Sequence, residues 1–400
     1  MKPKKWTTKS LGEISKFKSG GTPSKSNPNF WGGDIPWVTA KDMKTPLINN
    51  SIDKLTPEAL KVAKLAPCET LLILVRGMTL HKDLPLAITT RELAFNQDIK
   101  ALTTCKEVLP MFLMVYLSSQ KHKILQLVDS AGHGTGRLDT ELLKSFPINY
   151  PTIFEQKQIV GVLATWESAI EKTEALITAK EKQFEWLTSN LINRAGYKRT
   201  AASGLMTEVS KRNKNSTIER VLSVTNHSGF VLPEEQFERR VASANVSNYK
   251  VVEQGQYAYN PSRINVGSIA RLDDWENGIL SPMYVVFKLD TKKVCSDYFL
   301  HWLNSSEARQ RIKNSAQGSV RETVSFKDLG AIDIPLPAIE MQKDVTYKLN
   351  LAQKEISLLK NTLEQYRSQK RGLMQKLLTG KWQVSSSQPV AEDMYQEASA

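Results

Sequence analysis

Two stretches of the chain, residues 151–194 and 337–380, place apolar side chains at alternating intervals of four and three residues. In the first stretch these positions are Ile159, Leu163, Trp166, Ile170, Thr173, Ile177, Lys180, Phe184, Leu187 and Leu191. In the second they are Val345, Leu349, Ala352, Ile356, Leu359, Leu363, Tyr366, Lys370, Leu373 and Leu377. This spacing predicts two long helices, each with a narrow apolar stripe typical of a coiled coil. We expect the two stripes to pack on each other; the alternative is that each helix packs on its own globular domain.

The ends of both helices have their own signals. Thr152 and Glu155 have the spacing of a capping box, and Gly196 and Gly380 suit the points where the helices stop. Each helix of about 40 residues would be about 60 Å long.

The remaining segments lack sustained helical periodicity. Residues 1–150 predict a mixed α and β domain, with strands at 35–39 and 70–75 and a helix that starts at Met111. Residues 218–336 predict a second such domain. The polar, basic segment 195–217 is expected to be a linker, and 385–400 a disordered tail.

The chain is an internal repeat. A shift of 186 residues lays residues 151–157 over 337–343, and Leu187 over Leu373. A period this long exceeds that of a solenoid repeat, so a whole domain and its helix were duplicated. The predicted fold class is therefore α+β: two mixed domains and two long helices, related by a pseudo-twofold repeat. Two similar halves imply two similar sites.

The charge is strongly basic and unevenly distributed. The net charge is +13; residues 1–150 carry 21 Lys or Arg against 13 Asp or Glu, whereas residues 201–336 carry 17 against 15. This surplus favours a polyanionic partner such as nucleic acid; the alternative is a basic protein without such a partner. The sequence has no apolar run long enough for a membrane helix, no signal peptide and only three scattered cysteines, so we expect a cytoplasmic protein.

Catalytic and metal-binding motifs are missing from the sequence. There is no Walker A motif, no zinc-ligand spacing among the five histidines, and residues 132–136 are glycine-rich without a dinucleotide fingerprint. Residues 260–263 (Asn-Pro-Ser-Arg) lack the second proline and the aromatic residue of an adenine methyltransferase site. We therefore expect no catalytic residues and no metal ion.

Each half has a glycine and an arginine in a polar loop shortly before its long helix. These are Gly134 with Arg137, and Gly318 with Arg321, and such an arginine can contact a phosphate or read guanine. The alternative is a turn whose arginine pairs with an acid such as Asp139 or Glu322. Together with basic residues beside the predicted strands and the 20–25 loop, the candidate nucleic-acid contacts are Lys18, Thr22, Lys25, Lys41, Arg76, Thr135, Arg137, Arg240, Arg263, Ser319 and Arg321.

The order of the short motifs resembles the specificity subunit of type I restriction-modification systems. The resemblance rests on Leu-Gly-Glu-Ile at 11–14, Ser-Gly-Gly-Thr-Pro at 19–23, Ile-Pro-Trp-Val at 35–38, the two helix entries at 151–156 and 337–342, and the ending at 377–382. It covers residues 6–384. The second half departs from the pattern, because it lacks the glycine loop and has Met341 where the first half has a glutamate.

The resemblance implies that residues 1–150 and 218–336 are target recognition domains that each read one half of a split, asymmetric double-stranded DNA site. It implies that the two helices form an antiparallel coiled coil that sets the gap between the half-sites. It further implies two modification subunits, which carry S-adenosylmethionine, and restriction subunits that use ATP and Mg, while this chain holds no cofactor and no active site. The alternative function is a coiled-coil scaffold without DNA specificity.

Overall fold

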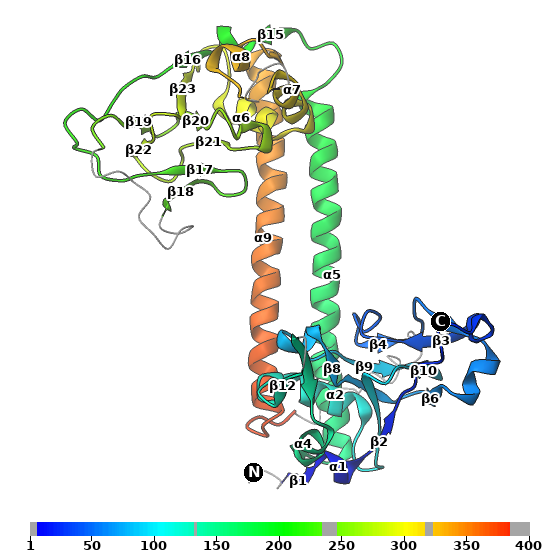
Figure 1. Cartoon of the computed structure of the whole chain (residues 1–400). Coiled ribbons are helices and arrows are strands. Elements are labelled where there is room, and N and C mark those ends of the chain that lie inside the picture. The colour runs from blue at the N-terminus through cyan, green and yellow to red at the C-terminus, as the bar shows by residue number, and fades with distance from the viewer. Residues whose placement is uncertain (1–5, 132–133, 234–245, 317–322, 385–400) are drawn as a thin grey trace. The chain divides into compact units, whose positions relative to one another are not determined.

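The computed structural model describes residues 6–131, 134–233, 246–316 and 323–384, with the side chains of residues 130 and 131 left out. The chain divides into two compact units. Unit 1 comprises Met1–Lys172 and Leu363–Ala400, and unit 2 comprises Thr173–Thr362. Each long helix therefore contributes one segment to each unit (Figure 1). The mixed α and β composition predicted from the sequence is confirmed.

The main sheet of unit 1 has five strands in the order β2-β11-β7-β9-β4. Their bounds are β2 (Ser15–Ser19), β4 (Leu47–Ile48), β7 (Leu71–Leu74), β9 (Leu86–Thr89) and β11 (Ile99–Thr104). The pairs are antiparallel except β4 with β9. All four residues of β7 are buried, as expected for an apolar run at the centre of a sheet.

Three smaller sheets complete the strands of unit 1, in the orders β5-β3-β10-β6, β12-β13-β8 and β1-β14. Their bounds are β1 (Thr7–Ser10), β3 (Trp31–Val38), β5 (Lys54–Leu55), β6 (Lys64–Ala66), β8 (Arg76–Gly77), β10 (Leu93–Phe95), β12 (Val128–Ala131), β13 (Thr135–Leu138) and β14 (Pro147–Tyr150). The β3 sheet has a small core of its own around Trp37 and Leu55.

The helices of unit 1 cover the main sheet and share its core. They are α1 (Leu11–Ile14), α2 (Pro110–Ser119), α3 (Lys121–Leu125) and α4 (Thr140–Ser145), with single turns η1 (Pro28–Phe30), η2 (Pro57–Lys61) and η3 (Met78–His81). Phe112 and Leu113 of α2 are fully buried among the strand residues. The same core takes in Ile159 and Leu163 of α5 (Ile153–Ile192) and Leu377 of α9 (Ile339–Leu377).

Unit 2 repeats the plan of unit 1 with a sheet in the order β16-β23-β20-β21. Its strands are β15 (Arg199–Ala201), β16 (Met206–Glu208), β17 (Ser223–Thr225), β18 (Gly229–Val231), β19 (Lys250–Glu253), β20 (Tyr257–Tyr259), β21 (Ile269–Arg271), β22 (Asn277–Leu280), β23 (Val285–Leu289) and β24 (Asp333–Pro335). Its helices are α6 (Ser296–Asn304), α7 (Ser306–Ala316) and α8 (Phe326–Gly330), with single turns η5 (Ala202–Gly204) and η7 (Ile264–Val266).

The repeat read from the sequence is also a repeat of strand order. In unit 1 the strands β2, β11, β7 and β9 are consecutive neighbours, and in unit 2 the strands β16, β23, β20 and β21 occupy the same places, every pair antiparallel. The pair β1 with β14 likewise has its counterpart in β15 with β24. Each unit therefore presents an equivalent strand end, after β7 in one and after β20 in the other.

The predicted linker at 195–217 was wrong. This segment contains β15, which pairs with β24, and β16, which pairs with β23 at the edge of the unit 2 sheet. Leu205 and Met206 are buried in the core of unit 2. Three-residue strands are too short to show an alternating pattern, so the polar composition of the segment concealed its place in the sheet. The predicted tail at 385–400 lies outside the described residues.

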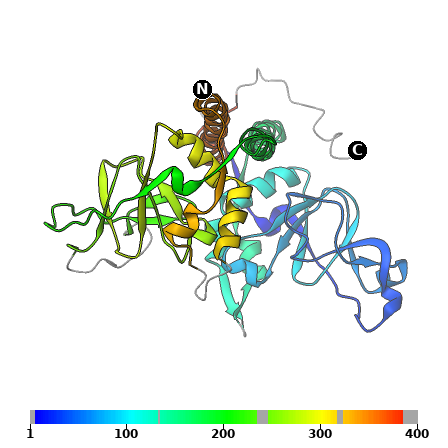
Figure 2. The ribbon, with the colours of Figure 1, turned by 90° about the horizontal axis from the view of Figure 1, so that it is seen from above.

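The long helices lie side by side and antiparallel within each unit (Figures 1 and 2). In unit 1, Glu167 of α5 forms an ion pair with Lys370 of α9, and the Trp166 ring meets the Tyr366 ring edge-on at 5.6 Å. In unit 2, Lys180 pairs with Glu355 at 2.8 Å and Glu181 with Lys360 at 2.6 Å.

The direction of the helices follows from which residues meet. In unit 1, Ile159, which precedes Glu167, shares a core with Leu377, which follows Lys370. In unit 2, Ile192, which follows Lys180, shares a core with Val345, which precedes Glu355. In both units, positions further along α5 lie beside positions nearer the start of α9, so the two helices are antiparallel.

The apolar stripes are the buried faces of the two helices. All the stripe residues that we predicted to form the helix interface are buried or partly buried: Ile159, Leu163, Trp166, Ile170, Ile177, Phe184, Leu187, Leu349, Ile356, Leu359, Leu363, Tyr366 and Leu373. Gly196 and Gly380 follow the helices with φ of 94° and 69°, the left-handed conformation expected just beyond a helix end. The capping box is half formed: Glu155 N–H donates to the Thr152 hydroxyl at 3.4 Å, and one Glu155 carboxylate oxygen has no hydrogen-bond partner in the described part of the chain.

Candidate nucleic-acid interface

Arg76 and Arg137 lie directly opposite each other on the antiparallel strands β8 and β13. Side chains at opposed positions of an antiparallel pair are on the same face, with their Cβ atoms about 4.5–5.5 Å apart, and like charges placed there repel. Both side chains are exposed, and neither forms an ion pair with any of the described acidic residues. Two cations held together in this way form a site that an anion would stabilise.

The fold fixes the two arginines through backbone contacts around them. The N–H of Val75, at the end of the buried strand β7, donates to the Asp98 carbonyl at 2.8 Å, and the Val75 carbonyl accepts from Leu138 at 2.8 Å. Beside them Gly136 faces Gly77, and a Cβ at Gly136 would lie 3.1 Å from the Gly77 carbonyl oxygen. A glycine at 136 thus lets β13 approach β8 closely, which brings Arg137 to Arg76.

Thr135 is on the same strand two residues before Arg137, so its side chain lies on the same face. Asp129 of β12 is paired with Arg137 on the other side, which leaves one positive charge in excess. Asp139 caps α4, and its carboxylate accepts from the N–H groups of Glu141 at 2.8 Å and Leu142 at 3.1 Å. These backbone hydrogen bonds lower the pKa of Asp139, with a smaller effect of Arg137. The alternative in which Arg137 pairs with Asp139 is therefore not what the structure shows.

Among the other unit 1 candidates, Lys18 and Lys41 have partners within the protein. Lys18 of β2 donates to the Leu65 carbonyl at 2.7 Å. Lys41 forms an ion pair with Asp53 at 2.8 Å, and this hydrogen bond raises the pKa of Lys41. Lys25 is exposed in the turn at 25–26.

The glycine loop at 20–25 has a packing role. A Cβ at Gly20 would lie 2.1 Å from the Asn96 carbonyl oxygen, so only glycine fits against β10. Gly21 N–H donates to the Phe95 carbonyl at 3.0 Å, and the Thr22 hydroxyl bonds to the Gln97 side chain. These contacts account for the glycines without a phosphate; whether Thr22 also contacts DNA stays a prediction.

In unit 2, Arg263 lies in the segment after β20, as Arg76 lies in the segment after β7. Arg263 is in the turn before η7 and is exposed. The remaining unit 2 candidates, Arg240, Ser319 and Arg321, lie outside the described residues. From the sequence, Arg76 and Arg137 could be predicted only as separate candidates. The only local feature they share is a neighbouring glycine, which does not indicate that they are opposite each other on paired strands.

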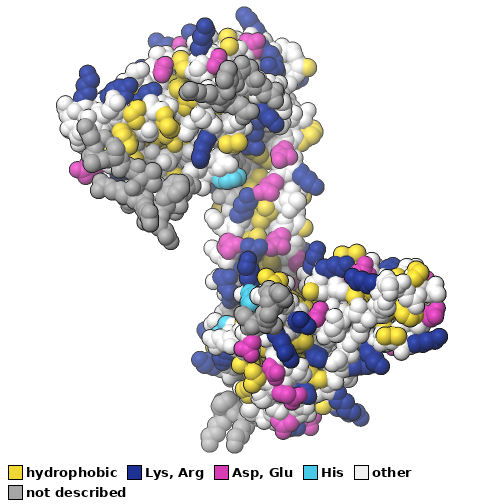
Figure 3. Space-filling view, viewed as in Figure 1, with side chains coloured by type: hydrophobic (Ala, Val, Ile, Leu, Met, Phe, Trp, Pro, Cys, Tyr) yellow, Lys and Arg dark blue, Asp and Glu magenta, His cyan; other side chains and the backbone are white. Residues whose placement is uncertain are grey.

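The surface of unit 1 agrees with a polyanion partner. In the view of Figure 3, Lys and Arg side chains are spread over unit 1, including the region that carries β8 and β12 in Figure 1. No helix in the described part of the chain is both long and apolar enough to cross a membrane. The described residues also hold no cluster of three or more His, Cys, Asp or Glu side chains that could bind a metal ion.

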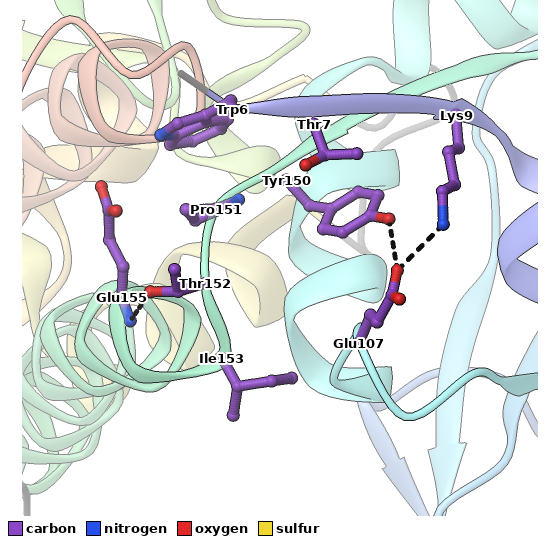
Figure 4. A pocket seen from close by; sticks show the side chains of 9 residues that line it. All are labelled: Trp6, Thr7, Lys9, Glu107, Tyr150, Pro151, Thr152, Ile153 and Glu155. Carbon is purple, nitrogen blue, oxygen red and sulfur yellow. Dashed lines mark hydrogen bonds and ion pairs between the residues drawn. The ribbon is translucent and has the colours of Figure 1, made fainter. Parts of the chain in front are cut away.

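A pocket of about 470 Å³ lies in unit 1 between β1, β14 and the start of α5 (Figure 4). Glu107 accepts hydrogen bonds there from Lys9 at 3.0 Å and from the Tyr150 hydroxyl at 2.9 Å. The Lys9 hydrogen bond is the largest of the effects that lower the pKa of Glu107, so this carboxylate stays ionised at neutral pH. Through these hydrogen bonds Glu107 links β1 and β14 to the segment before α2.

Comparison with known proteins finds similarity to type I specificity subunits. Residues 3–180 match the model of the type I restriction modification DNA specificity domain. The chain is 36% identical over 185 residues to the EcoR124I/EcoR124II specificity subunit of Escherichia coli, which is 44% of this chain and 46% of that protein. It is 31% identical over 191 residues to the MjaIX specificity subunit of Methanocaldococcus jannaschii, which is 46% of this chain and 41% of that protein. The matches thus span less than half the length of these relatives.

Solved structures share the fold over nearly the whole chain. The crystal structure of a type I restriction-modification S subunit from M. genitalium superposes with a TM-score of 0.57, at 15% identity, over 94% of this chain and 97% of that one. A structure described as explaining complex assembly and conformational transition of the type I R-M system gives 0.57 at 13% identity, over 94% and 98%. The resemblance to type I specificity subunits thus extends over residues 3–180 in sequence, and the solved structures show that the fold is shared beyond them.

Proposed function

We propose that this chain is the DNA sequence-specificity subunit of a type I restriction-modification complex. The observation that carries the proposal is the pair Arg76 and Arg137, two exposed cations on opposed strands within the residues that match the DNA specificity domain. Arginine in this arrangement can bind a phosphate or make a bidentate pair with guanine. The mutual repulsion of the two charges would be relieved by the DNA backbone.

Each unit reads one half of a bipartite, asymmetric site. The equivalent strand orders of the two sheets support two related reading surfaces, as does the presence of an exposed arginine in the segments after β7 and β20. The side chains differ between the copies, as required of two surfaces that read different bases. A chain with two linked half-site readers binds the second half-site intramolecularly, so two weak contacts combine into tight binding.

The paired long helices act as the spacer between the two readers, as an antiparallel coiled coil. The four-three stripes and the ion pairs Glu167–Lys370 and Lys180–Glu355 support this role. Helices of 40 and 39 residues have a length of about 60 Å, comparable with roughly two turns of DNA at about 34 Å each. The gap between half-sites is then part of the specificity.

The chemistry belongs to partner subunits. Two modification subunits carry S-adenosylmethionine and methylate adenine, and restriction subunits use ATP and Mg to translocate and cleave. This chain recruits them, binds double-stranded DNA and has no catalytic residues of its own. Its place is the cytoplasm of a bacterium or archaeon.

The proposal is tested by co-expressing the chain with the modification subunit encoded beside it and mapping adenine methylation by single-molecule sequencing. We expect a split asymmetric motif with a fixed gap that disappears when the chain is deleted. Exchange of residues 1–150 for those of a relative should change one half of the motif only. Methylation that continues unchanged without the chain would support the coiled-coil scaffold instead.

A further inference from the structure

We propose that Met78 is a specificity-determining residue that contacts the 5-methyl group of a thymine in the half-site read by unit 1. The inference rests on the proposed function and adds to it a residue that carries no charge. Met78 is the first residue of η3 and comes two residues after Arg76. Its exposed fraction is 65%, whereas Leu80 in the same turn is buried at 1%.

Met78 is displayed on a fixed support. Leu80 anchors η3 in the core of unit 1, and the ring Nε2 of His81 is 2.7 Å from the Gly134 carbonyl oxygen at the start of β13. A Cβ at Gly136 would meet the Leu80 Cβ at 3.0 Å, so β13 and η3 are in close contact. The turn that bears Met78 is thus joined to the strand that bears Arg137.

This combination of side chains matches the edge of a DNA duplex better than it matches a protein. The two exposed arginines, with only Asp129 opposite one of them, leave a net positive charge that an anion would offset, and Met78 adds an exposed apolar side chain two residues from Arg76. The major groove offers partners for both, because the phosphates flank it and the thymine 5-methyl group lies within it.

Unit 2 also has exposed apolar side chains close to the arginine that follows β20. Arg263 follows β20 and is itself followed by Val266, which is 62% exposed, and Met283 nearby is 63% exposed. The Asn260 side-chain nitrogen is 3.8 Å from the Met283 sulfur, so these two residues lie close together. Single exposed apolar residues are common on protein surfaces; here each unit has one within three residues of the arginine that follows an equivalent strand.

The test uses the complex with its modification subunits and a fluorescent duplex that contains the mapped motif. In turn, each thymine of the unit 1 half-site is replaced by deoxyuridine, which removes one methyl group. We expect one such replacement to weaken binding by about fourfold, the value of one buried methyl group. Met78→Ala should weaken binding to the thymine duplex and abolish the difference between thymine and uridine at that position.

Matched controls separate the possible causes. Met78→Leu should keep the discrimination, because leucine is apolar and of similar size, which excludes loss of folding as the explanation. Leu142→Ala, which truncates another exposed apolar side chain of unit 1, should leave the discrimination unchanged. An equal loss by Met78→Ala on thymine and uridine duplexes would refute the inference, as would a unit 1 half-site made only of G·C pairs. A wild-type complex that shows no sequence-specific binding at all would instead refute the proposed function.

Discussion

The side-chain carbonyl of Gln156 accepts a hydrogen bond from the backbone N–H of Leu109 at 2.8 Å, which fastens the start of α5 to the start of α2. The Gln156 amide donates to the carbonyls of Glu107 at 2.8 Å and Pro151 at 2.9 Å. Gln342 in unit 2 makes the same three bonds. It accepts from the N–H of Cys295 at 2.8 Å and donates to the carbonyls of Lys293 at 3.3 Å and Pro337 at 2.8 Å.

Gln156→Ala should therefore destabilise unit 1. The side chain is fully buried, and its loss leaves one N–H and two carbonyls without these partners. We expect the free energy of unfolding to fall by about 2–4 kcal/mol, because buried polar groups left unpaired each cost about 1–3 kcal/mol. Urea unfolding measures the change, with the exposed neighbour Lys157→Ala as control. A decrease in the free energy of unfolding no larger than that of the control would show that the Gln156 hydrogen bonds do not stabilise unit 1.

Neutralising the arginine pair should separate DNA affinity from stability. Arg76→Gln and Arg137→Gln should each lower affinity and reduce the slope of log affinity against log salt by about 0.9, the effect of one lost phosphate contact. The free energy of unfolding should be unchanged or slightly higher, because a like-charge contact is removed.

Lys144→Gln is a suitable control for the arginine variants, because Lys144 forms an ion pair with Glu141 at 2.8 Å on the surface of the same unit. Fluorescence anisotropy over a salt series measures the DNA affinity and its dependence on salt. If the slope of log affinity against log salt is the same for the arginine variants, the control and the wild type, Arg76 and Arg137 do not contact phosphates. Lys41→Gln should have a weaker effect than either arginine variant, since Lys41 is already paired with Asp53.

Unit 2 should lose stability in mild acid through His301. This side chain of α6 is buried, and Nε2 lies 2.6 Å from the Asn350 side-chain oxygen on α9. Burial lowers the pKa of His301, partly opposed by Asn350 and Asp297 and reinforced by Arg271. The unfolded chain therefore binds a proton more readily than the folded chain.

The stability that His301 contributes should be complete above pH 6.5, the usual histidine value, and should decline as the pH falls from there towards the lower folded pKa. Urea unfolding at pH 7.5 and 5.5 measures this decline. In His301→Gln the difference between the two pH values should shrink, whereas in the exposed control His122→Gln it should equal that of the wild type. A variant that keeps the full difference would assign the acid sensitivity to other groups.

Lengthening both helices should change the gap between half-sites. One heptad inserted into α5 and one at the matching place in α9 preserve the stripe and add about 10 Å, close to three base pairs. Methylation mapping should then report the same two half-sites with a longer gap. Insertion into α5 alone shifts its apolar stripe relative to that of α9, so this control should lose adenine methylation. An unchanged gap in the double insertion would refute the spacer role.

The long helices and the repeat could be predicted because their signals are local or periodic. A four-three stripe is readable in any sequence, and its positions in both helices proved buried or partly buried. The offset of 186 residues predicted that Gln342 repeats Gln156, and the structure gives both the same hydrogen bonds. The strands in 199–208 could not be predicted, because their partners β24 and β23 lie far away in the sequence.

The duplication, the helices with their buried faces, the basic character of the first half and the family resemblance could all be predicted, since they depend on composition and spacing. Which candidate side chains meet depends on the tertiary structure. It set Arg137 against Arg76, gave Lys41 the partner Asp53 and pressed Gly20 against the backbone of β10. The physical reason is that strand pairing joins residues by register across the sheet, and register between distant segments is set by packing of the whole core.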